Sequence, residues 1–326
     1  MIRSLRRRSI FTVVALVAAS LAGGPPTAAG EHADGAPPVI VAVGDLACRV
    51  QPARDQGAIC RSDLVADLIT QIDPDRFLAL GDLQYEKGSL EDFLRVYDVQ
   101  FGHLNDITAP APGNHEYGTP DAQGYFDYFG AVAAPPDGYY SFDLGGWHLV
   151  SLNSEICGTE PGCGPGTPQH EWLQADLEES DADCTLAYWH HPRYDWRPWQ
   201  KWVTEDDPTP NGGSEVAPLI PLWELLYGHG AELVLSGHNH VYHRWEPQNA
   251  HGDVVEGGIV QFTVGTGGRL LYSRGRPPVP ENLAAFQNDA FGVLKMTLYP
   301  DSYDFEWMSA EGQPAYSDAG VNVACS

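Results

Sequence analysis

Four short apolar runs in this chain each end in a glycine that is followed by a side chain able to bind a metal. The runs are VIVAVGD ending at Asp45, RFLALGD ending at Asp82, ITAPAPGN ending at Asn114 and AELVLSGH ending at His238. Short apolar runs closed by glycine predict buried strands, and ligands of open α/β sheets gather beyond the carboxyl ends of the strands. The pattern therefore predicts a fold in which several strand ends converge on one metal site.

The segments between these runs have helical periodicity. Apolar side chains recur at helical spacing in residues 62–72, where Ser62 or Asp63 is placed to cap a helix, and again in residues 89–101. Strands and helices thus alternate, which implies parallel strands joined by helical crossovers.

The second half of the chain adds a different pattern. YYSFDL and WHLVSLN flank Gly145 and Gly146, which predicts a β-hairpin. Helices are expected at 167–179 and 216–227. The strands expected after residue 240 are at 241–247, 257–267, 291–300 and 302–309. A mixed α/β sandwich, with two sheets inside and helices outside, accounts for both halves.

The first 29 residues have the features of a secretory signal. Four arginines between positions 3 and 8 precede an apolar run and a small-residue cleavage site at 27–29. The adjacent arginines before Ser9 also fit a twin-arginine signal. A membrane anchor is the weaker alternative, because the apolar run is short for a span of about 20 residues. We expect a signal peptide at 1–29, a short linker at 30–37, and one secreted α/β domain at 38–326.

The charge and the cysteines fit an exported protein. The chain has 18 basic and 44 acidic residues and a net charge of -26, so neither nucleic acid nor an anionic membrane is an expected partner. Six cysteines in an exported chain suggest disulfides, for which 15 pairings are possible. Proximity along the chain favours the pairs Cys48 with Cys60 and Cys157 with Cys163, which leaves Cys184 to pair with Cys325.

Five clusters carry residue types that bind hard or borderline metal ions. They are Asp45, Asp82 with Tyr85, Asn114 with His115, His190 with His191, and His238 with His240. Each is weak alone, because an aspartate beside glycine is often a turn residue and a lone histidine is more often structural. Their joint occurrence at expected strand ends favours a metal centre. His148 and His243 lie outside the clusters and are expected to be structural.

The order of these motifs resembles a known family. GDLA at 44–47, GDLQY at 81–85, GNHE at 113–116, a strand-end histidine and GHNH at 237–240 are similar to the calcineurin-like metallophosphoesterase superfamily, specifically its purple acid phosphatase branch. The resemblance implies a four-layer αββα sandwich with two mixed sheets. The branch rests on Tyr85, because Ala47 stands where many members have a histidine ligand.

The resemblance also implies two metal ions and their ligands. The ferric site would be formed by Asp45, Asp82, Tyr85 and His240. The second site, for divalent Fe, Zn or Mn, would share Asp82 as the bridge and add Asn114, His190 and His238. His115 and His191 are the candidate catalytic residues that contact phosphate or protonate the leaving group, although His115 has the alternative role of supporting Asn114.

The expected function is that of an exported, acid phosphatase-like phosphohydrolase with a binuclear metal centre. The resemblance implies hydrolysis of small phosphomonoesters by a metal-held hydroxide. A phosphodiesterase acting on nucleotides or phospholipid head groups is the alternative within enzymes. A non-catalytic secreted binding protein on the same fold is the alternative from another class. The sequence leaves the oligomeric state open, and no stable membrane insertion is expected after signal cleavage.

Overall fold

The computed structural model describes residues 35–48, 60–196, 217–274 and 278–325. The expected signal peptide and most of the linker lie outside these residues. Within the described ranges, no helix is long and apolar enough to cross a membrane.

Thirteen strands form two mixed sheets in the described part of the chain. The six-stranded sheet has the order β13-β12-β11-β1-β2-β3 and the seven-stranded sheet has the order β10-β8-β9-β7-β6-β5-β4. The strands are β1 (Val39–Val43), β2 (Arg76–Leu80), β3 (Thr108–Ala111), β4 (Tyr140–Leu144), β5 (Trp147–Ser151), β6 (Cys184–Trp189), β7 (Leu233–Ser236), β8 (Tyr242–Trp245), β9 (Val260–Val264), β10 (Leu283–Gln287), β11 (Gly292–Tyr299), β12 (Ser302–Ser309) and β13 (Ala319–Ala324). Strands β1 to β3 are parallel, and so are β5, β6, β7 and β9.

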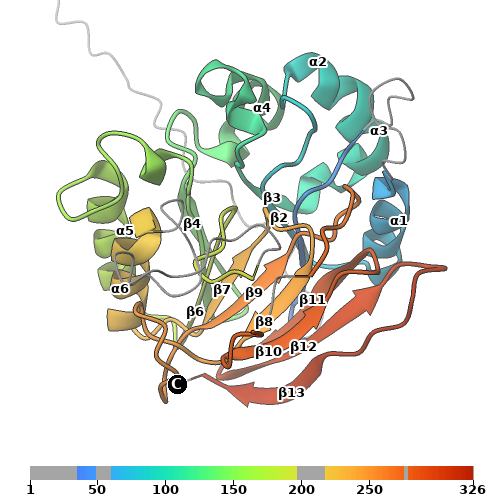
Figure 1. Cartoon of the computed structure of the whole chain (residues 1–326). Coiled ribbons are helices and arrows are strands. Elements are labelled where there is room, and N and C mark those ends of the chain that lie inside the picture. Colours follow the sequence, from blue (N-terminus) through green and yellow to red (C-terminus); the bar gives the residue numbers. More distant parts are fainter. Residues whose placement is uncertain (1–34, 49–59, 197–216, 275–277, 326) are drawn as a thin grey trace, which may run out of the picture. The chain divides into compact units, whose positions relative to one another are not determined.

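Helices lie on both sides of the pair of sheets, with α5 and α6 on one side and α1 on the other (Figure 1). The helices are α1 (Ser62–Ile72), α2 (Leu90–Asp92), α3 (Asp98–Phe101), α4 (Gln123–Phe129), α5 (Pro168–Glu179) and α6 (Ile220–Gly228). A π-helical turn, η1 (Phe93–Tyr97), joins α2 to α3. Short 3₁₀ segments are η2 (Gly102–Ile107), η3 (Glu116–Gly118), η4 (Pro120–Ala122), η5 (Gly130–Ala133), η6 (Ile156–Gly158) and η7 (Ala217–Leu219).

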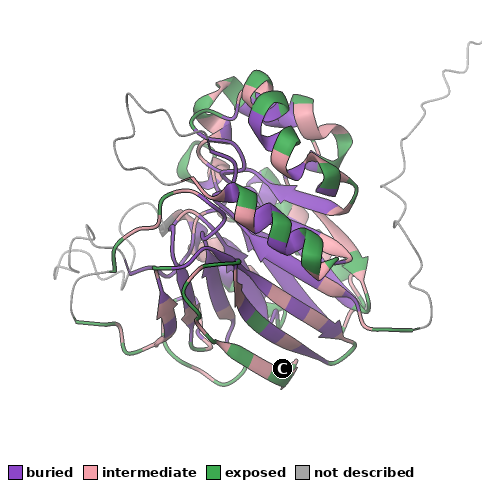
Figure 2. Ribbon diagram, turned by 90° about the vertical axis from the view of Figure 1, so that its right-hand side faces the viewer, coloured by how far each residue is buried: buried purple, intermediate pink, exposed green. Residues whose placement is uncertain are grey.

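The alternation of side chains along the strands explains the layers. In β6, Leu186 and Tyr188 belong to the core between the two sheets, whereas Ala187 and Trp189 pack against α5 and α6. Successive side chains of a strand point to opposite faces, so a strand that is apolar throughout must be covered on both sides. Figure 2 shows this burial as a nearly continuous buried interior, with exposed residues on the outer helix faces. The expected four-layer α/β sandwich is confirmed.

One detail of the expected helices is wrong. Helix α1 has the predicted bounds, but neither Ser62 nor Asp63 caps it, because the residue before the first turn is Arg61. The Ser62 hydroxyl instead donates to the side-chain oxygen of Gln100, 2.7 Å away, and so joins α1 to α3. The hairpin around Gly145 and helix α5 have the bounds that the sequence predicts.

The six cysteines form three disulfides, Cys48 with Cys60, Cys157 with Cys163, and Cys184 with Cys325. These are the three pairs expected from the sequence, two from proximity along the chain and the third as the remaining pair. The second bridge closes a loop after β5, and the third joins the start of β6 to the end of the chain.

Candidate metal centre

Five parallel strands end next to the candidate ligands. Asp45 follows β1, Asp82 follows β2 and Asn114 follows β3 in the first sheet; His190 follows β6 and His238 follows β7 in the second. The two sheets therefore contribute their carboxyl ends to one place, where ligand sites of open α/β sheets are found.

The glycines before these residues are required by close approach. A Cβ atom on Gly81 would lie 2.5 Å from Nδ1 of His190, and a Cβ atom on Gly113 would lie 2.4 Å from Oδ1 of Asp82. Carbon atoms are not found that close to side-chain nitrogen or oxygen atoms, so any other residue would push the strand ends apart. The glycine in each motif thus allows ligands from different strands to meet.

Three of the candidate ligands adopt backbone angles that L-residues rarely adopt. The φ angles are +62° for Asp45, +50° for Asp82 and +69° for His238. Left-handed conformations at non-glycine residues carry strain and cluster at functional sites. Here the strained turns are fixed by hydrogen bonds, since the backbone N–H of His238 donates to Oδ2 of Asp45 at 2.8 Å.

One group of donor atoms surrounds the hydroxyl of Tyr85, and we call it the tyrosine-side set. The Tyr85 hydroxyl donates to Oδ1 of Asp45 at 2.7 Å and lies 3.1 Å from Oδ2 of Asp82 and 3.0 Å from Nε2 of His240. The His240 Nε2 is also 3.1 Å from Oδ1 of Asp45. Three oxygen donors and one nitrogen donor therefore face a common centre.

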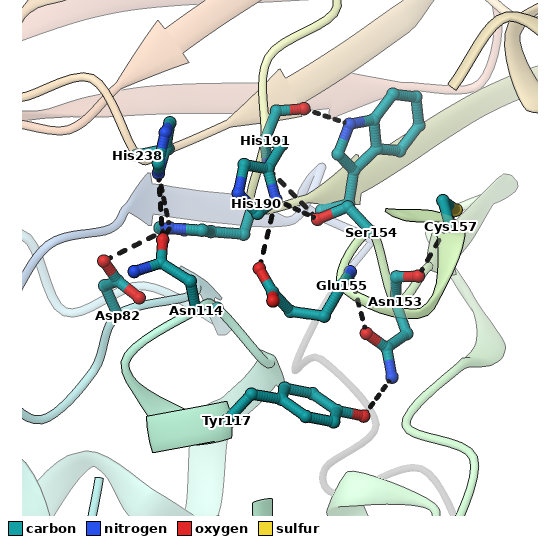
Figure 3. Close-up of polar contacts among 12 residues, drawn as sticks. Asp82, Asn114, Tyr117, Asn153, Ser154, Glu155, Cys157, His190, His191 and His238 are labelled. Atoms are coloured by element: carbon teal, nitrogen blue, oxygen red, sulfur yellow. Dashed lines mark hydrogen bonds and ion pairs between the residues drawn. The ribbon is translucent and has the colours of Figure 1, made fainter. Parts of the chain in front are cut away.

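A second group surrounds Nε2 of His190, and we call it the histidine-side set (Figure 3). This atom lies 3.3 Å from Oδ2 of Asp82, 3.2 Å from Oδ1 of Asn114 and 3.2 Å from Nδ1 of His238. The His238 Nδ1 is 3.0 Å from the same Asn114 oxygen. Oδ2 of Asp82 belongs to both sets, which makes this carboxylate the point where they join.

The donor set fits metal ions. In both His190 and His240 the Nδ1 atom donates to a backbone carbonyl, of Leu80 at 2.9 Å and of Leu270 at 2.7 Å. This leaves Nε2 with its lone pair toward the cluster, the arrangement typical of histidine ligands. Ligand atoms whose bonds to one ion are about 2.0–2.2 Å long lie about 3 Å from one another. The neighbouring donor atoms of this cluster have that spacing. Oxygen donors with imidazole suit iron, zinc or manganese.

The charges of the cluster are strongly coupled. Burial alone raises the pKa of Asp82, but the neighbouring His190 and His115 outweigh burial and hold that pKa well below its usual range. Burial lowers the pKa of His190, yet the Asp82 charge raises it to about 10. Burial and the charges of Asp45 and Asp82 raise the pKa of Tyr85 well above its ordinary value. An added cation would favour both the ionised phenol and the neutral imidazole, because each is disfavoured without it.

The two candidate catalytic histidines lie against different sets. The His115 ring is 4.2 Å from the Tyr85 ring, and its Nδ1 donates to the carbonyl of Glu86 at 2.6 Å. The His191 ring is 4.3 Å from the His238 ring. All nine site residues expected from the sequence are therefore brought together, with His115 and His191 at the edge of the cluster.

The residues that hold His191 were not expected from the sequence. Ser154 Oγ lies 3.0 Å from Nδ1 of His191 and accepts from its backbone N–H at 3.1 Å. Glu155 Oε1 is 3.3 Å from the same Nδ1, and burial raises the pKa of Glu155 to about 7. Both come from the loop after β5 that the Cys157 disulfide closes (Figure 3). A Ser-Glu pair has no local signal, and only the pairing of β5 with β6 brings it to His191.

Glu116 fixes the backbone beside the cluster. Its buried carboxylate accepts four backbone N–H groups, from Asp82, Leu83, Gln84 and Gly113, at 2.8 to 3.2 Å. It therefore fixes the loop after β2 against the loop after β3, and so places Asp82.

Comparisons with known proteins agree with this geometry. The calcineurin-like phosphoesterase family matches residues 38–242. Acid phosphatase type 7 of Danio rerio is 26% identical over 263 residues, which are 70% of this chain and 57% of that protein. Purple acid phosphatase 22 of Arabidopsis thaliana is 31% identical over 161 residues, 47% of this chain and 32% of that protein. The chain thus spans about half the length, or less, of these curated relatives.

The fold is also found in a solved structure. Purple acid phosphatase PPD1 from yellow lupin seeds superposes with a TM-score of 0.70 and 18% identity over 86% of this chain and 52% of that one. The family match covers the motifs from Asp45 to His240 that form the cluster. The chain therefore belongs to the calcineurin-like phosphoesterase family, and within it resembles the purple acid phosphatases.

Proposed function

We propose that this protein is an exported hydrolase of small phosphomonoesters that works with two metal ions. The observation that carries the proposal is the position of Asp82, whose Oδ2 lies within 3.3 Å of both the Tyr85 hydroxyl and Nε2 of His190. A single carboxylate oxygen between two groups of donors is what a bridging ligand of a binuclear centre requires.

The residues divide between the two ions according to these groups. Asp45, Tyr85 and His240 would hold ferric iron together with Asp82, because carboxylate and phenolate oxygens suit a hard ion. Asn114, His190 and His238 would hold a divalent Fe, Zn or Mn ion with the same Asp82. When bound, the two ions supply Lewis acidity toward phosphoryl oxygens and a nucleophilic water near neutral pH.

Burial indicates the side from which a substrate enters. Asp45, Asp82, His190 and His240 are at most 4% exposed. Four further residues of the cluster are partly exposed, namely Asn114, His115, His191 and His238. A phosphate ester would therefore approach along this partly exposed edge, with a histidine on each side.

Contacts at one ring nitrogen fix the orientation of each of the two histidines. In His115, Nδ1 donates to the Glu86 carbonyl, and Nε2 lies 3.7 Å from Oδ2 of Asp82. In His191, Nδ1 contacts Ser154 and Glu155. We propose that one of them protonates the leaving alcohol and the other donates to a phosphoryl oxygen.

Metal analysis with a visible spectrum and an activity assay tests this function. We expect two metal equivalents per chain, a tyrosinate-to-iron absorption band, and faster hydrolysis of nitrophenyl phosphate than of bis-nitrophenyl phosphate. Fully active protein with fewer than two metal equivalents would refute the binuclear centre. The reverse substrate preference would favour the phosphodiesterase, and no hydrolysis by metal-loaded protein would favour a binding protein.

Export and the division of the chain belong to the same proposal. We propose that residues 1–29 are removed and that 38–326 form the catalytic domain. The three disulfides support an oxidising destination, because disulfides persist mainly outside the cytosol. Mass spectrometry of the exported protein would locate the new N-terminus, and an intact N-terminus on secreted protein would contradict the proposed cleavage.

A further inference from the structure

The segment at residues 269–272 is attached to the tyrosine-side set by several contacts. The backbone N–H of Arg269 donates to the carbonyl of Asp45 at 3.1 Å, and the carbonyl of Leu270 accepts from Nδ1 of His240. The ring of Tyr272 stacks on the ring of His240, with centroids 4.1 Å apart and planes inclined by 12°. The position of this segment is therefore fixed by two of the residues proposed to bind iron.

Arg269 extends from this segment to the tyrosine itself. Its guanidinium carbon lies 5.1 Å from the centroid of the Tyr85 ring. Its Nη2 is 2.7 Å from Oε1 of Glu86, the next residue along the chain, and the Arg269 side chain is only 19% exposed. An arginine within about 6 Å of an aromatic ring makes a cation–π interaction, which is stronger where the cation is partly desolvated. The Glu86 carboxylate holds the guanidinium in this position.

The guanidinium of Arg269 lies over the ring of Tyr85, whereas the hydroxyl of Tyr85 contacts Asp45 and Asp82. A positive charge beside the ring stabilises the electron density of an ionised phenol, and this stabilisation is lost when that density leaves the ring. If Tyr85 held ferric iron as a phenolate, moving an electron from the ring to the iron would therefore require more energy with Arg269 than without it.

We infer that Arg269 is a positioning residue that sets the electronic properties of Tyr85 as an iron ligand, through its contact with the ring. This inference rests on the proposed function, because it requires Tyr85 to bind ferric iron. It predicts that removing the Arg269 charge moves the visible band to longer wavelength without removing iron.

The test uses metal-loaded full-length protein and the variants Arg269→Gln, Arg269→Lys and Glu86→Gln. We expect the visible maximum of Arg269→Gln to shift by on the order of 10 nm to longer wavelength, because losing a cation–π interaction of ordinary strength changes the energy of a visible transition by about that much. Arg269→Lys keeps the charge and should shift less, and Glu86→Gln should shift less than Arg269→Gln because the guanidinium remains. Arg95→Gln is the matched control, since Arg95 pairs with Glu91 on an exposed helix surface.

The outcomes of this test distinguish a failure of the inference about Arg269 from a failure of the proposed function. If wild-type protein has no visible band, the iron–tyrosine centre itself is wrong. If wild-type protein has the band and it does not move in Arg269→Gln, or moves equally in Arg269→Lys, the inference about Arg269 is wrong. An unmoved band with a raised KM would make Arg269 a substrate contact instead. If Arg269→Gln fails to fold, the other two variants are compared with wild type. A visible band at the wild-type position in both Arg269→Lys and Glu86→Gln would then contradict the inference.

Discussion

Two regions of the molecule place a histidine among acids, and they differ in where the ring nitrogens point. His148 in the hairpin has both nitrogens on carboxylates, Nδ1 at 2.9 Å from Asp143 and Nε2 at 2.9 Å from Asp176. His190 has Nδ1 on a backbone carbonyl, while Nε2 faces Asp82 and the ring nitrogen of His238.

The difference separates an ion pair from a candidate metal site. A protonated His148 satisfies both of its acids, so nothing further is required there. At His190, two imidazole nitrogens lie 3.2 Å apart beside one carboxylate and one amide oxygen, and only one proton fits between the two nitrogens. An ion satisfies all of these lone pairs at once. Nearness of histidine to aspartate is thus a weaker signal for metal than the convergence of several lone pairs.

The largest effect is expected when the shared carboxylate is removed. Asp82→Asn should lose metal from both sites and lower kcat/KM by roughly a thousandfold or more, because Asp82 is the proposed bridge between the two ions. Metal content and nitrophenyl phosphate hydrolysis measure this. Asp143→Asn is the matched control from the His148 region and should keep both ions. Equal metal loss in the two variants would end the distinction between the regions.

A smaller, selective effect is expected when a donor is removed from only one of the two sets. Tyr85→Phe should abolish the visible band and keep the divalent ion, because only the tyrosine-side set loses a donor. His238→Ala should keep the band and lose the divalent ion. Metal analysis and absorption spectra of the two proteins check this. Loss of both ions in both variants would mean that the sets are not independent.

The two edge histidines are expected to affect turnover without affecting metal. His115→Ala and His191→Ala should each lower kcat by roughly a hundredfold or more. The variant that lacks the leaving-group acid should lose more activity on an alkyl phosphate than on nitrophenyl phosphate, since nitrophenolate leaves without protonation. His229→Ala, at the exposed end of α6, is the control. If neither variant shows the leaving-group dependence, neither histidine is the acid.

The sequence predicts the proposed ligands and the strands because each motif is local. An apolar run, a glycine and a polar side chain occupy a few adjacent residues, and the run must be buried. Strands β10 and β13 were not expected. Strand β13 lies at the edge of its sheet and is mostly exposed, so it has no continuous apolar run. Its pairing with β12 depends on the whole sheet.

The supporting contacts could not be predicted for a related reason. Each of the three supporting residues contacts a residue far away in the sequence: Glu116 contacts Gln84, 32 positions away, Ser154 contacts His191, 37 positions away, and Arg269 contacts Tyr85, 184 positions away. Which loops meet depends on the order of strands in two sheets, and sequence periodicity does not fix that order. The sequence therefore identifies which residues are candidates for binding metal, but not what holds them in place.

The smallest expected effect concerns His148, and it tests the ion-pair half of the comparison. Burial acts to lower the pKa of His148, but its hydrogen bonds to Asp176 and Asp143 outweigh burial and raise it. A raised pKa in the folded state stabilises the fold below the unfolded value of about 6.5, and the contribution is lost as pH rises through the folded pKa. His148→Gln should therefore lower Tm by about 2 °C at about pH 5.5, and the difference from wild type should shrink by about pH 9. A Tm difference that does not change with pH would mean that His148 is neutral. The His148 region would then not be an ion pair, and its contrast with the converging lone pairs at His190 would fail.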